Sequence, residues 1–525
     1  MMTRLLRPLL LTCTALLAGA GPLLADDSML TTPGGGDPAF AQLLDSTLAA
    51  LTPATYADTR DMLRQAAGLS PLAQPRPVDM PEIPRLPNAA AVEEANLQFA
   101  LVQLSMLAGT NDQLSLLKAQ PDTTAPKALV LRGGEFTLGQ LGAAVEAAGI
   151  DGMRRSADGN GWILSRPLIV WQDAALRLMP GEELTMVTDS GAFLLSFGRL
   201  AMKEATLAGD NERSTRAPNF RPFVMVVGQG SLYADGVQFS HLGFTTGSSF
   251  GGVVVANSGL FKPEFAPVVV NSHLDDIRML RFERASDLYV ANNSFAASSL
   301  IVKGGHGLAI ERNILTASPS SAAIVITDQA RDVALVGNMI VKATGMGILV
   351  DGLSQRISVD RNIIDSTEGV GLNIRRSTCV AVDSNLVTRA ERAALRITDS
   401  GWAWLTNNAV LLNRSAGFEV EDQTAGTRLW LTGNRLAANR VGMIGAGLGD
   451  ILMVWNDLAD QLPRQFGGEF TPHLAGYLKA VEGPIKAGGY AIRDIRLVEA
   501  AMTDASEYPL FLSSPPSWPD ICREE

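Results

Sequence analysis

The chain has 525 residues, of which 46% are hydrophobic and 18% charged, with a formal net charge of −11. This length and hydrophobic content allow a large buried core and more than one domain. The net negative charge argues against nucleic acid as a partner, because binding to a phosphate backbone depends on clustered Lys and Arg. The chain has 4 histidines, and none stands at metal-ligand spacing, so we expect no metal and no cofactor.

The N-terminal sequence MMTRLLRPLLLTCTALLAGAGPLLADD predicts an export signal. Two arginines precede an apolar run, and Ala25 before Asp26 offers a cleavage site. The run is too short for an ordinary membrane span, and no later stretch reaches about 18 apolar residues without charge. We therefore expect residues 1–25 to be removed and the mature protein to be periplasmic, with no membrane span.

Two cysteines, Cys379 and Cys522, remain after that cleavage. An oxidising compartment permits a disulfide between them. Two cysteines so far apart do not make a disulfide framework, so the sequence leaves their pairing open.

Residues 26–127 are expected to form a helical region with a proline-rich linker. The stretch DPAFAQLLDSTLAALT offers Asp37 as helix N-cap and Pro38 at the first helical position, followed by apolar residues at helical spacing. A second helix is predicted for NAAAVEEANLQFALVQLSMLAG, residues 88–109. Between the two, SPLAQPRPVDMPEIPRLP has too many prolines for a helix and predicts an extended segment.

From about residue 128 the sequence changes to short β-branched runs separated by Gly, Asn and Asp, a pattern typical of strands. From residue 271 onward an asparagine recurs at a mean interval of about 23 residues. The recurring residues are Asn271, Asn293, Asn313, Asn338, Asn362, Asn385, Asn408, Asn434 and Asn456. Around the last eight, the positions two after, three before and five before the asparagine are almost uniformly apolar, which predicts a solenoid.

Leucine-rich repeats share part of this pattern, but they place a leucine three residues before the first apolar position. Here only Leu448 fits, and the other repeats have Ala, Gly or Ser. Each repeat continues with a second short strand, such as GILVD or GLNIR, rather than a helix. The sequence therefore predicts an all-β fold, a right-handed parallel β-helix over residues 128–462, followed by a cap or tail over 463–525. Stacked coils would place the asparagine amides in a hydrogen-bonded ladder, so we expect a structural role for them.

The stretch NFRPFVMVVGQGSLYADGVQFSHLGFTTGSSFGG, residues 219–252, resembles the periplasmic mannuronan C5-epimerases of bacterial alginate biosynthesis. In that family an Arg-Pro-Phe, a Phe-x-His-Leu-Gly-aromatic segment and a Ser-aromatic-Gly follow one another at similar spacing. Here they occupy 221–223, 239–244 and 249–251. The resemblance covers roughly residues 165–460. It implies a β-helix protein that inverts C5 of a uronic acid inside a polymer, by removing and returning a proton, beside the export machinery.

The catalytic Asp-Pro-His-Asp stretch of that family is missing. The corresponding coil reads SSLIVKGGHGLAIERN, in which His306 is the only imidazole. Proton abstraction at C5 needs a base close to the proton and a cation for the enolate-like carboxylate. His306 as base and Lys303 as cation are therefore the candidate catalytic residues, and the alternative is that His306 is an exposed turn residue. Asp328 stands where the family has an arginine.

Arg278 and Arg281 are candidate substrate-binding residues because, in the alignment that the resemblance implies, they stand near positions where the family has tyrosines. Strand alternation predicts that Asn373, Arg375 and Arg396 face outward, where they could hold a carboxylate, and they complete the candidates. The alternative for the last three is a structural ladder of ion pairs with Asp351, Glu419 and Glu421. Ahead of them, Ile301, Val325 and Leu349 form an apolar outward column, which predicts a surface covered by the N-terminal helices, the C-terminal tail or a partner.

Three functional hypotheses remain open. The first is an exported protein of the epimerase type that modifies a uronate-containing exopolysaccharide during secretion. The second is a non-catalytic relative that binds such a polymer within a periplasmic export complex. The third is a polysaccharide lyase, which shares the proton-abstraction step. In each case the expected partner is an anionic polysaccharide.

Overall fold

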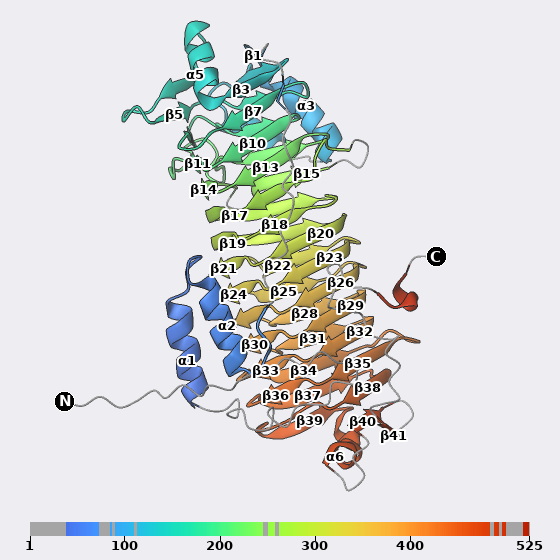
Figure 1. Cartoon of the computed structure of the whole chain (residues 1–525). Helices are drawn as coiled ribbons and strands as arrows, with labels where there is room; N and C mark the ends of the chain where they lie inside the picture. The colour runs from blue at the N-terminus through green and yellow to red at the C-terminus, as the bar shows by residue number, and fades with distance from the viewer. Residues whose placement is uncertain are drawn as a thin grey trace, which may run out of the picture.

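The computed structural model describes residues 38–72, 85–86, 90–109, 113–244, 250–257, 262–482, 488–492, 496–499 and 518–523. The expected export signal and most of the proline-rich segment lie outside these residues. The described chain winds into the predicted right-handed parallel β-helix, between helix α5 (Leu138–Ala147) at one end and α6 (Leu474–Glu482) at the other (Figure 1).

Each regular coil contributes three strands, so the β-helix has three faces. The first face is a 15-stranded sheet that ends each coil just before the recurring asparagine. Its strands are β3 (Glu135–Thr137), β7 (Ala175–Leu178), β10 (Arg199–Lys203), β13 (Ser231–Asp235), β16 (Val268–Val270), β18 (Tyr289–Ala291), β20 (His306–Glu311), β23 (Arg331–Val336), β26 (Gln355–Asp360), β29 (Thr378–Asp383), β32 (Gly401–Thr406), β35 (Arg428–Thr432), β38 (Asp450–Val454), β40 (Gly488–Ala491) and β41 (Arg496–Glu499).

The second and third faces form one 26-stranded sheet, because two long strands, β17 (His273–Glu283) and β19 (Ser294–Lys303), run through both. The second face follows the asparagine and contains β5 (Gly161–Leu164), β8 (Glu183–Met186), β11 (Thr206–Gly209), β14 (Gln238–Ser240), β21 (Ile314–Thr316), β24 (Met339–Val341), β27 (Ile363–Asp365), β30 (Leu386–Thr388), β33 (Ala409–Leu411) and β36 (Arg435–Ala437). The third face contains β2 (Lys127–Arg132), β6 (Leu168–Val170), β9 (Leu194–Ser196), β12 (Val224–Val227), β15 (Gly252–Ala256), β22 (Ala322–Thr327), β25 (Met346–Val350), β28 (Leu372–Arg375), β31 (Leu395–Thr398), β34 (Ala416–Glu421), β37 (Val441–Ala446) and β39 (Arg464–Gly468).

The bend between the first and second faces explains the recurring asparagine. The residue just before it has a left-handed backbone in every coil, for example Arg361 with φ of 53° and Asn407 with φ of 52°. Such a bend turns peptide groups away from the sheet ladders, and buried peptide groups need other partners. The side chain of Asn362 supplies them, since its Oδ1 accepts from the backbone N–H of Asn338 at 2.8 Å and its Nδ2 donates to the Leu335 carbonyl at 2.8 Å.

The amides also bond one another from coil to coil, as predicted. Nδ2 of Asn338 donates to Oδ1 of Asn362 at 3.0 Å, and Nδ2 of Asn362 donates to Oδ1 of Asn385 at 3.0 Å. The ladder runs unbroken from Asn293 to Asn456, and all eight side chains are buried.

Two details differ from the expectation. Asn271 is not in the ladder, because it occupies the left-handed position itself and is exposed, while Ser272 takes the ladder position and its N–H donates to Asn293 Oδ1 at 2.9 Å. A second, shorter ladder at the bend after the second face was not predicted. There Asn413 Nδ2 donates to Asn439 Oδ1 at 2.8 Å.

Apolar side chains stack on like side chains in the interior. The column three residues before the asparagine, from Val290 to Met453, and the column two residues after it, from Phe295 to Leu458, both belong to one continuous core. Burying each such side chain contributes about 1.5–3 kcal/mol. Because each coil contacts its neighbours, the core has no weak boundary at which the regular coils separate into domains.

The N-terminal end of this core is closed by a helix and a strand that the sequence analysis missed. Helix α5 lies within the region expected to be only strands, and it buries Leu138, Leu141 and Val145 against the first coil. Strand β1 (Ala91–Asn96) pairs antiparallel with β2, so the predicted helix over 88–109 is wrong in its first half. Asn96 caps α3 (Leu97–Ala108) by accepting from the N–H of Gln98 at 2.9 Å, which ends the strand and begins the helix.

The first two helices pack on the second face rather than on one another alone. Helices α1 (Pro38–Ala49) and α2 (Tyr56–Ala66) lie along the C-terminal half of the β-helix (Figure 1). Phe40, Leu44 and Leu63 contact outward side chains of the second-face strands, from Ile314 on β21 to Ala437 on β36. Arg64 of α2 is fully buried, and its Nη1 donates to the Ser384 carbonyl at 2.7 Å.

Other segments cover the N-terminal coils and the C-terminal end. Helices α3 and α4 (Gln113–Ala119) cover the third face of the first coils. At the other end α6 packs on the core, and the Tyr477 hydroxyl donates to the Asn456 carbonyl at 2.6 Å, while β40 pairs antiparallel with β38.

The division of the chain into domains at residues 127 and 462 stays a prediction. Among the described residues, no helix is both long and apolar enough to cross a membrane.

The final described segment, residues 518–523, lies on the first face. It is joined there by a disulfide between Cys379 and Cys522, whose Cα atoms are 5.8 Å apart. The pairing that the sequence left open is therefore present in the structure.

We expect Asn362→Ala to lower the free energy of unfolding by about 2–5 kcal/mol, because each buried group left without a partner costs about 1–3 kcal/mol. The groups affected include the backbone N–H and Nδ2 of Asn338. Chemical denaturation followed by circular dichroism measures this change. Asn271→Ala, outside the ladder, is the matched control, and an equal loss in both variants would contradict the structural role of the ladder.

A second prediction concerns Asp360, which is buried beside Arg64 and Arg361. Burial raises its pKa to about 7, Asp383 adds to the effect, and the two arginines oppose it. Its Oδ1 has no hydrogen-bond partner among the described residues. The unfolded carboxyl releases its proton near pH 4, with a pKa of about 3.9. The folded state binds more protons between that pH and about 7, so stability falls as pH rises through this window.

Asp360→Asn should remove that pH dependence and raise the unfolding free energy at pH 8 by about 1–3 kcal/mol, because no charge is then buried. Denaturation midpoints measured at several pH values test this, with the exposed Asp399→Asn as control. A slope that persists in Asp360→Asn assigns the pH dependence to another group.

Candidate functional site

The third face presents two outward columns of side chains, one residue from each coil. The register of the parallel strands aligns the central column as Val130, Ile169, Leu195, Met225, Val254, Arg281, Ile301, Val325, Leu349, Asn373, Arg396, Glu419 and Ile444. The edge column, two residues further along each strand, contains Glu283, Lys303, Thr327, Asp351, Arg375, Thr398 and Glu421. Six of the seven predicted site residues lie on this face.

Among the described residues, a cover is present only over the N-terminal part of the central column. Helices α3 and α4 pack over Val130 to Val254. The expected cover of Ile301, Val325 and Leu349 by the N-terminal helices or the C-terminal tail is wrong for the described residues, because α1 and α2 lie on the second face and residues 518–523 on the first. Ile301 and Val325 are half-buried, and Leu349 is 9% exposed.

The N-terminal end of the uncovered part contains three of the predicted cations. Arg281 is buried, with its Nε 3.2 Å from Oε1 of Glu283, and burial lowers its pKa below the usual arginine value although Glu283 opposes this. Lys303, one coil further along the edge column, is half-buried. Arg278 has a left-handed backbone, with φ of 56°, at the irregularity of β17, three residues before Arg281.

His306 lies on a different face from Lys303. Two glycines, 304 and 305, turn the chain from the third face to the first, and His306 begins β20 as an exposed residue. Its Nε2 is 3.2 Å from the hydroxyl of Ser286 on the preceding coil. The two candidate catalytic residues are therefore close in the chain and lie on either side of a turn.

Asn373, Arg375 and Arg396 form a second group further along the columns. Lys303 and Arg375 stand in coils three steps apart, roughly 14 Å at the usual strand spacing. Arg375 pairs with Asp351, and Nε of Arg396 donates to Oε2 of Glu419 at 2.7 Å. These are two of the ion pairs that the structural alternative expects.

Asp351 also bonds a second arginine, Arg376, which sequence analysis did not select. Arg376 donates to it from Nε at 3.0 Å, so two half-exposed guanidinium groups share one carboxylate. Burial alone would raise the pKa of Asp351, but hydrogen bonds from Arg375, the Gly352 N–H and Arg376 lower it below its usual value. Counting one coil length from Asp351 reaches 375–376, and this periodicity is the signal that could have revealed Arg376.

Asn373 differs from the arginines because part of its amide has no partner. Its side chain is 8% exposed, Nδ2 lies 3.4 Å from the sulfur of Met346, and Oδ1 has no hydrogen-bond partner among the described residues. A ligand donor that reached this position would satisfy that oxygen.

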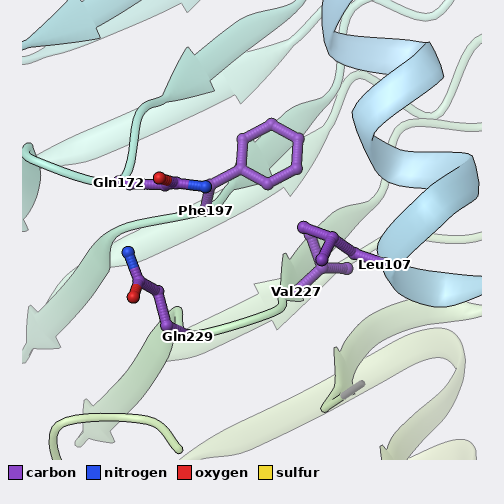
Figure 2. Close-up of a pocket in the computed structure, with 5 residues that line it drawn as sticks. All are labelled: Leu107, Gln172, Phe197, Val227 and Gln229. Carbon is purple, nitrogen blue, oxygen red and sulfur yellow. The ribbon is translucent and has the colours of Figure 1, made fainter. Parts of the chain in front are cut away.

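A hollow lies at the N-terminal end of the same edge of the β-helix, where helix α3 meets the turns after the third-face strands (Figure 2). It is lined by Leu107, Gln172, Phe197, Val227 and Gln229. In Figure 2 the two glutamine amides lie on the side away from the helix, while Leu107 and Val227 lie close to it. None of the five side chains ionises, so this hollow can bind a polar ligand but cannot exchange protons with it.

The chemistry available on the uncovered third face is therefore binding of anions beside apolar groups. Lys303, Arg375 and Arg376 supply positive charge, and the central column supplies aliphatic surface. Between Arg281 and Glu419 the two columns contain no histidine. Among the described residues, no group of three His, Cys, Asp or Glu side chains is placed to hold a metal ion.

Comparisons with known proteins agree with this architecture. A family model described as a right-handed β-helix region matches residues 278–446. The mannuronan C5-epimerase of Pseudomonas aeruginosa is 24% identical over 299 residues, which are 51% of this chain and 54% of that protein, so the match spans about half of the relative's length.

Solved structures of the periplasmic alginate epimerase AlgG have the same fold. A crystal structure of AlgG matches with a TM-score of 0.59 and 15% identity, over 86% of this chain and 100% of the AlgG chain. A double mutant of AlgG matches with the same TM-score and 16% identity, over 75% of this chain and 100% of the other. The resemblance to the epimerase-like parallel β-helix family is thereby confirmed.

Proposed function

From that family resemblance as a premise, we propose that this protein is a periplasmic polysaccharide-binding β-helix that holds a uronate-containing exopolysaccharide on its third face during secretion. The observation that carries the proposal is the uncovered strip in which the apolar residues Ile301, Val325 and Leu349 run beside Lys303 and Arg375. A pyranose ring presents apolar C–H surface, and a uronate adds a carboxylate at its edge. The strip has a partner for each.

Several features of the strip support a chain-like ligand. It continues through consecutive coils at about 4.8 Å per step, so similar groups recur along its length. Arg375 and Arg376 are about half exposed although both contact Asp351, which leaves donors directed to solvent. Leu353, 61% exposed in the turn beside them, extends the apolar surface.

The side chains that face outward in one coil, the coil of Ile301 and Lys303, favour binding without catalysis over C5 inversion. The resembling family has Asp-Pro-His-Asp there, and this chain has Ile301 and Lys303 on the third face. Ile301 cannot exchange a proton, and neither outward residue of this coil supplies the carboxylate or imidazole that the family's stretch contains. The export setting is supported by the predicted signal and by the periplasmic relatives.

C5 inversion is the second candidate, because one observation supports it. Lys303 and His306 are separated by two glycines, which permit a close approach of substrate to the turn. His306 is exposed and contacts only the neutral hydroxyl of Ser286 in the described hydrogen bonds. In this alternative His306 removes the C5 proton while Lys303 stabilises the enolate-like carboxylate. Nothing on the third face selects the lyase reaction.

The first test is binding of polymannuronate, measured by calorimetry at low ionic strength. Replacing two arginines with Arg375→Gln and Arg376→Gln should weaken binding by about tenfold or more, since charge-assisted hydrogen bonds are worth about 1.5–3 kcal/mol each. The matched control is Arg154→Gln with Arg155→Gln, two adjacent exposed arginines on β4 (Met153–Arg155) at the far end. An equal loss in both double variants, or no binding by the parent protein, overturns the proposal.

The second test is C5 inversion, followed by NMR of polymannuronate incubated with the purified protein. We expect no inversion, and guluronate signals would establish the second candidate instead. In that event His306→Ala should lower the rate by about 10²–10⁴-fold, the usual contribution of a general base. The exposed His273→Ala is the control. Unchanged activity in His306→Ala removes His306 as the base.

A further inference from the structure

The C-terminal half of the first face carries a stack of tryptophans that neither the third face nor the core explains. Trp404 of β32 and Trp430 of β35 stand at paired positions on adjacent coils and face outward. Their rings are 4.7 Å apart and 9° from parallel. Trp402 lies beside them, with its ring centroid 5.9 Å from that of Trp430. An outward face normally exposes such rings, yet Trp404 is 0% and Trp430 is 1% exposed.

Residues 518–523 lie over part of this stack. Trp518 approaches Trp404 with a centroid distance of 6.2 Å, and Trp518 and Cys522 belong to the same apolar cluster as the stack. In Figure 1 this short C-terminal segment lies at the side of the β-helix, near β26 and β29, and away from the end that α6 closes. It is therefore a cover for part of one face and not a cap.

The cover leaves polar groups of the stack unsatisfied. Nε1 of Trp430 is buried, and it has no hydrogen-bond partner among the described residues, nor does the Thr432 hydroxyl two residues further along the same strand. A buried N–H without an acceptor costs free energy that a fitted ligand would recover. Beside them Arg428, which pairs with Asp450 at 2.9 Å, lies 5.8 Å from the centre of the Trp430 ring.

The attachment of the cover is covalent at one point. The disulfide between Cys379 and Cys522 joins it to the coil next to the stack. The polar contacts of its own Arg523 stay within the segment, because Nη1 pairs with Asp520 at 2.9 Å and Nε donates to the Trp518 carbonyl at 3.2 Å. Among the described residues, the other contact between cover and face is the apolar packing of Trp518 and Cys522.

We propose that Trp404 and Trp430 form a second sugar-binding platform, which residues 518–523 occupy until the Cys379–Cys522 disulfide is reduced. Trp404 and Trp430 cover one face of each other, so a pyranose would pack its apolar face on the ring surface that Trp518 leaves. Nε1 of Trp430 would donate to a ring substituent, and Arg428 would receive a uronate carboxylate. This platform is on a different face from the strip proposed above and does not depend on it.

The opening step is an ordinary thiol–disulfide exchange. A thiolate of a dithiol reductant attacks one sulfur of the disulfide, and the second thiol of the reductant resolves the mixed disulfide. The reductant ends as a disulfide, and Cys379 and Cys522 end as two protonated thiols. Within the described residues, apolar contacts then hold the segment, so a ligand competes with Trp518 for the platform.

The test uses the full chain and a polymannuronate hexasaccharide as probe, with tryptophan fluorescence and calorimetry as readouts. We expect Cys522→Ser, or the parent protein treated with dithiothreitol, to show an additional binding event that the oxidised parent lacks. Trp430→Leu in the Cys522→Ser background should abolish that event and its fluorescence change. Trp171→Phe, which alters a tryptophan near α3 at the other end, should leave both unchanged.

Two further arms keep the outcome clear. Trp518→Ala retains the disulfide and the platform, and it should give the additional binding even if Cys522→Ser is poorly folded by circular dichroism. Arg375→Gln with Arg376→Gln should leave the additional event intact, which separates this site from the third-face strip. Equal binding by the oxidised parent, Cys522→Ser and Trp518→Ala, or an additional event that survives Trp430→Leu, overturns the proposal.

Discussion

The fold depends on one repeated interaction, the side-chain amide that bonds the backbone at the bend of the preceding coil and the amide of the next coil. A parallel β-helix must turn sharply between its faces, and each turn removes peptide groups from the sheet ladders. Asn362 and its equivalents return those hydrogen bonds from inside, because a short amide can donate and accept at once. Since every ladder residue contacts two neighbours, the coils are held in one register over the whole length.

That fixed register is what makes the outer faces functional surfaces. A residue type placed at one position of the repeat becomes a column on the surface, so a few substitutions decide whether a stretch is apolar, charged or aromatic. The same chain uses this rule three times. It covers the column from Ile314 to Ala437 with helices, covers the Trp404 stack with the C-terminal segment, and leaves the strip from Ile301 to Arg396 uncovered by the described residues.

The repeat was readable from the sequence because its physical cause is local. The spacing of Asn293 to Asn456 and the flanking apolar columns predicted the β-helix, the ladder and the outward direction of Ile301, Asn373 and Arg396. Asn271 was misplaced by one position because asparagine also suits the left-handed residue of the bend. Strand β1 was mistaken for helix because Ala and Glu carry little β preference, and only pairing with β2 makes that segment extended.

The site was less predictable, because it depends on what lies over each face. The local sequence does not indicate that α1 and α2 pack on the second face, or that residues 518–523 contact Trp404. These are contacts between segments hundreds of positions apart, such as the hydrogen bond from Arg64 to Ser384. The ion pairs of Arg375 and Arg396 could be foreseen from charge and coil length, whereas the partial burial of Lys303 could not.

The seating of the first two helices has a consequence for how the molecule is made. Asp45 pairs with Arg389, and Leu44 contacts coils that extend to Ala437, so the earliest described part of the chain meets its partners only after most later coils exist. Until those coils have formed, the apolar sides of these helices have no surface to pack on. Once the coils up to about residue 437 have formed, α1 and α2 can pack on them and join the N-terminal to the C-terminal part of the chain.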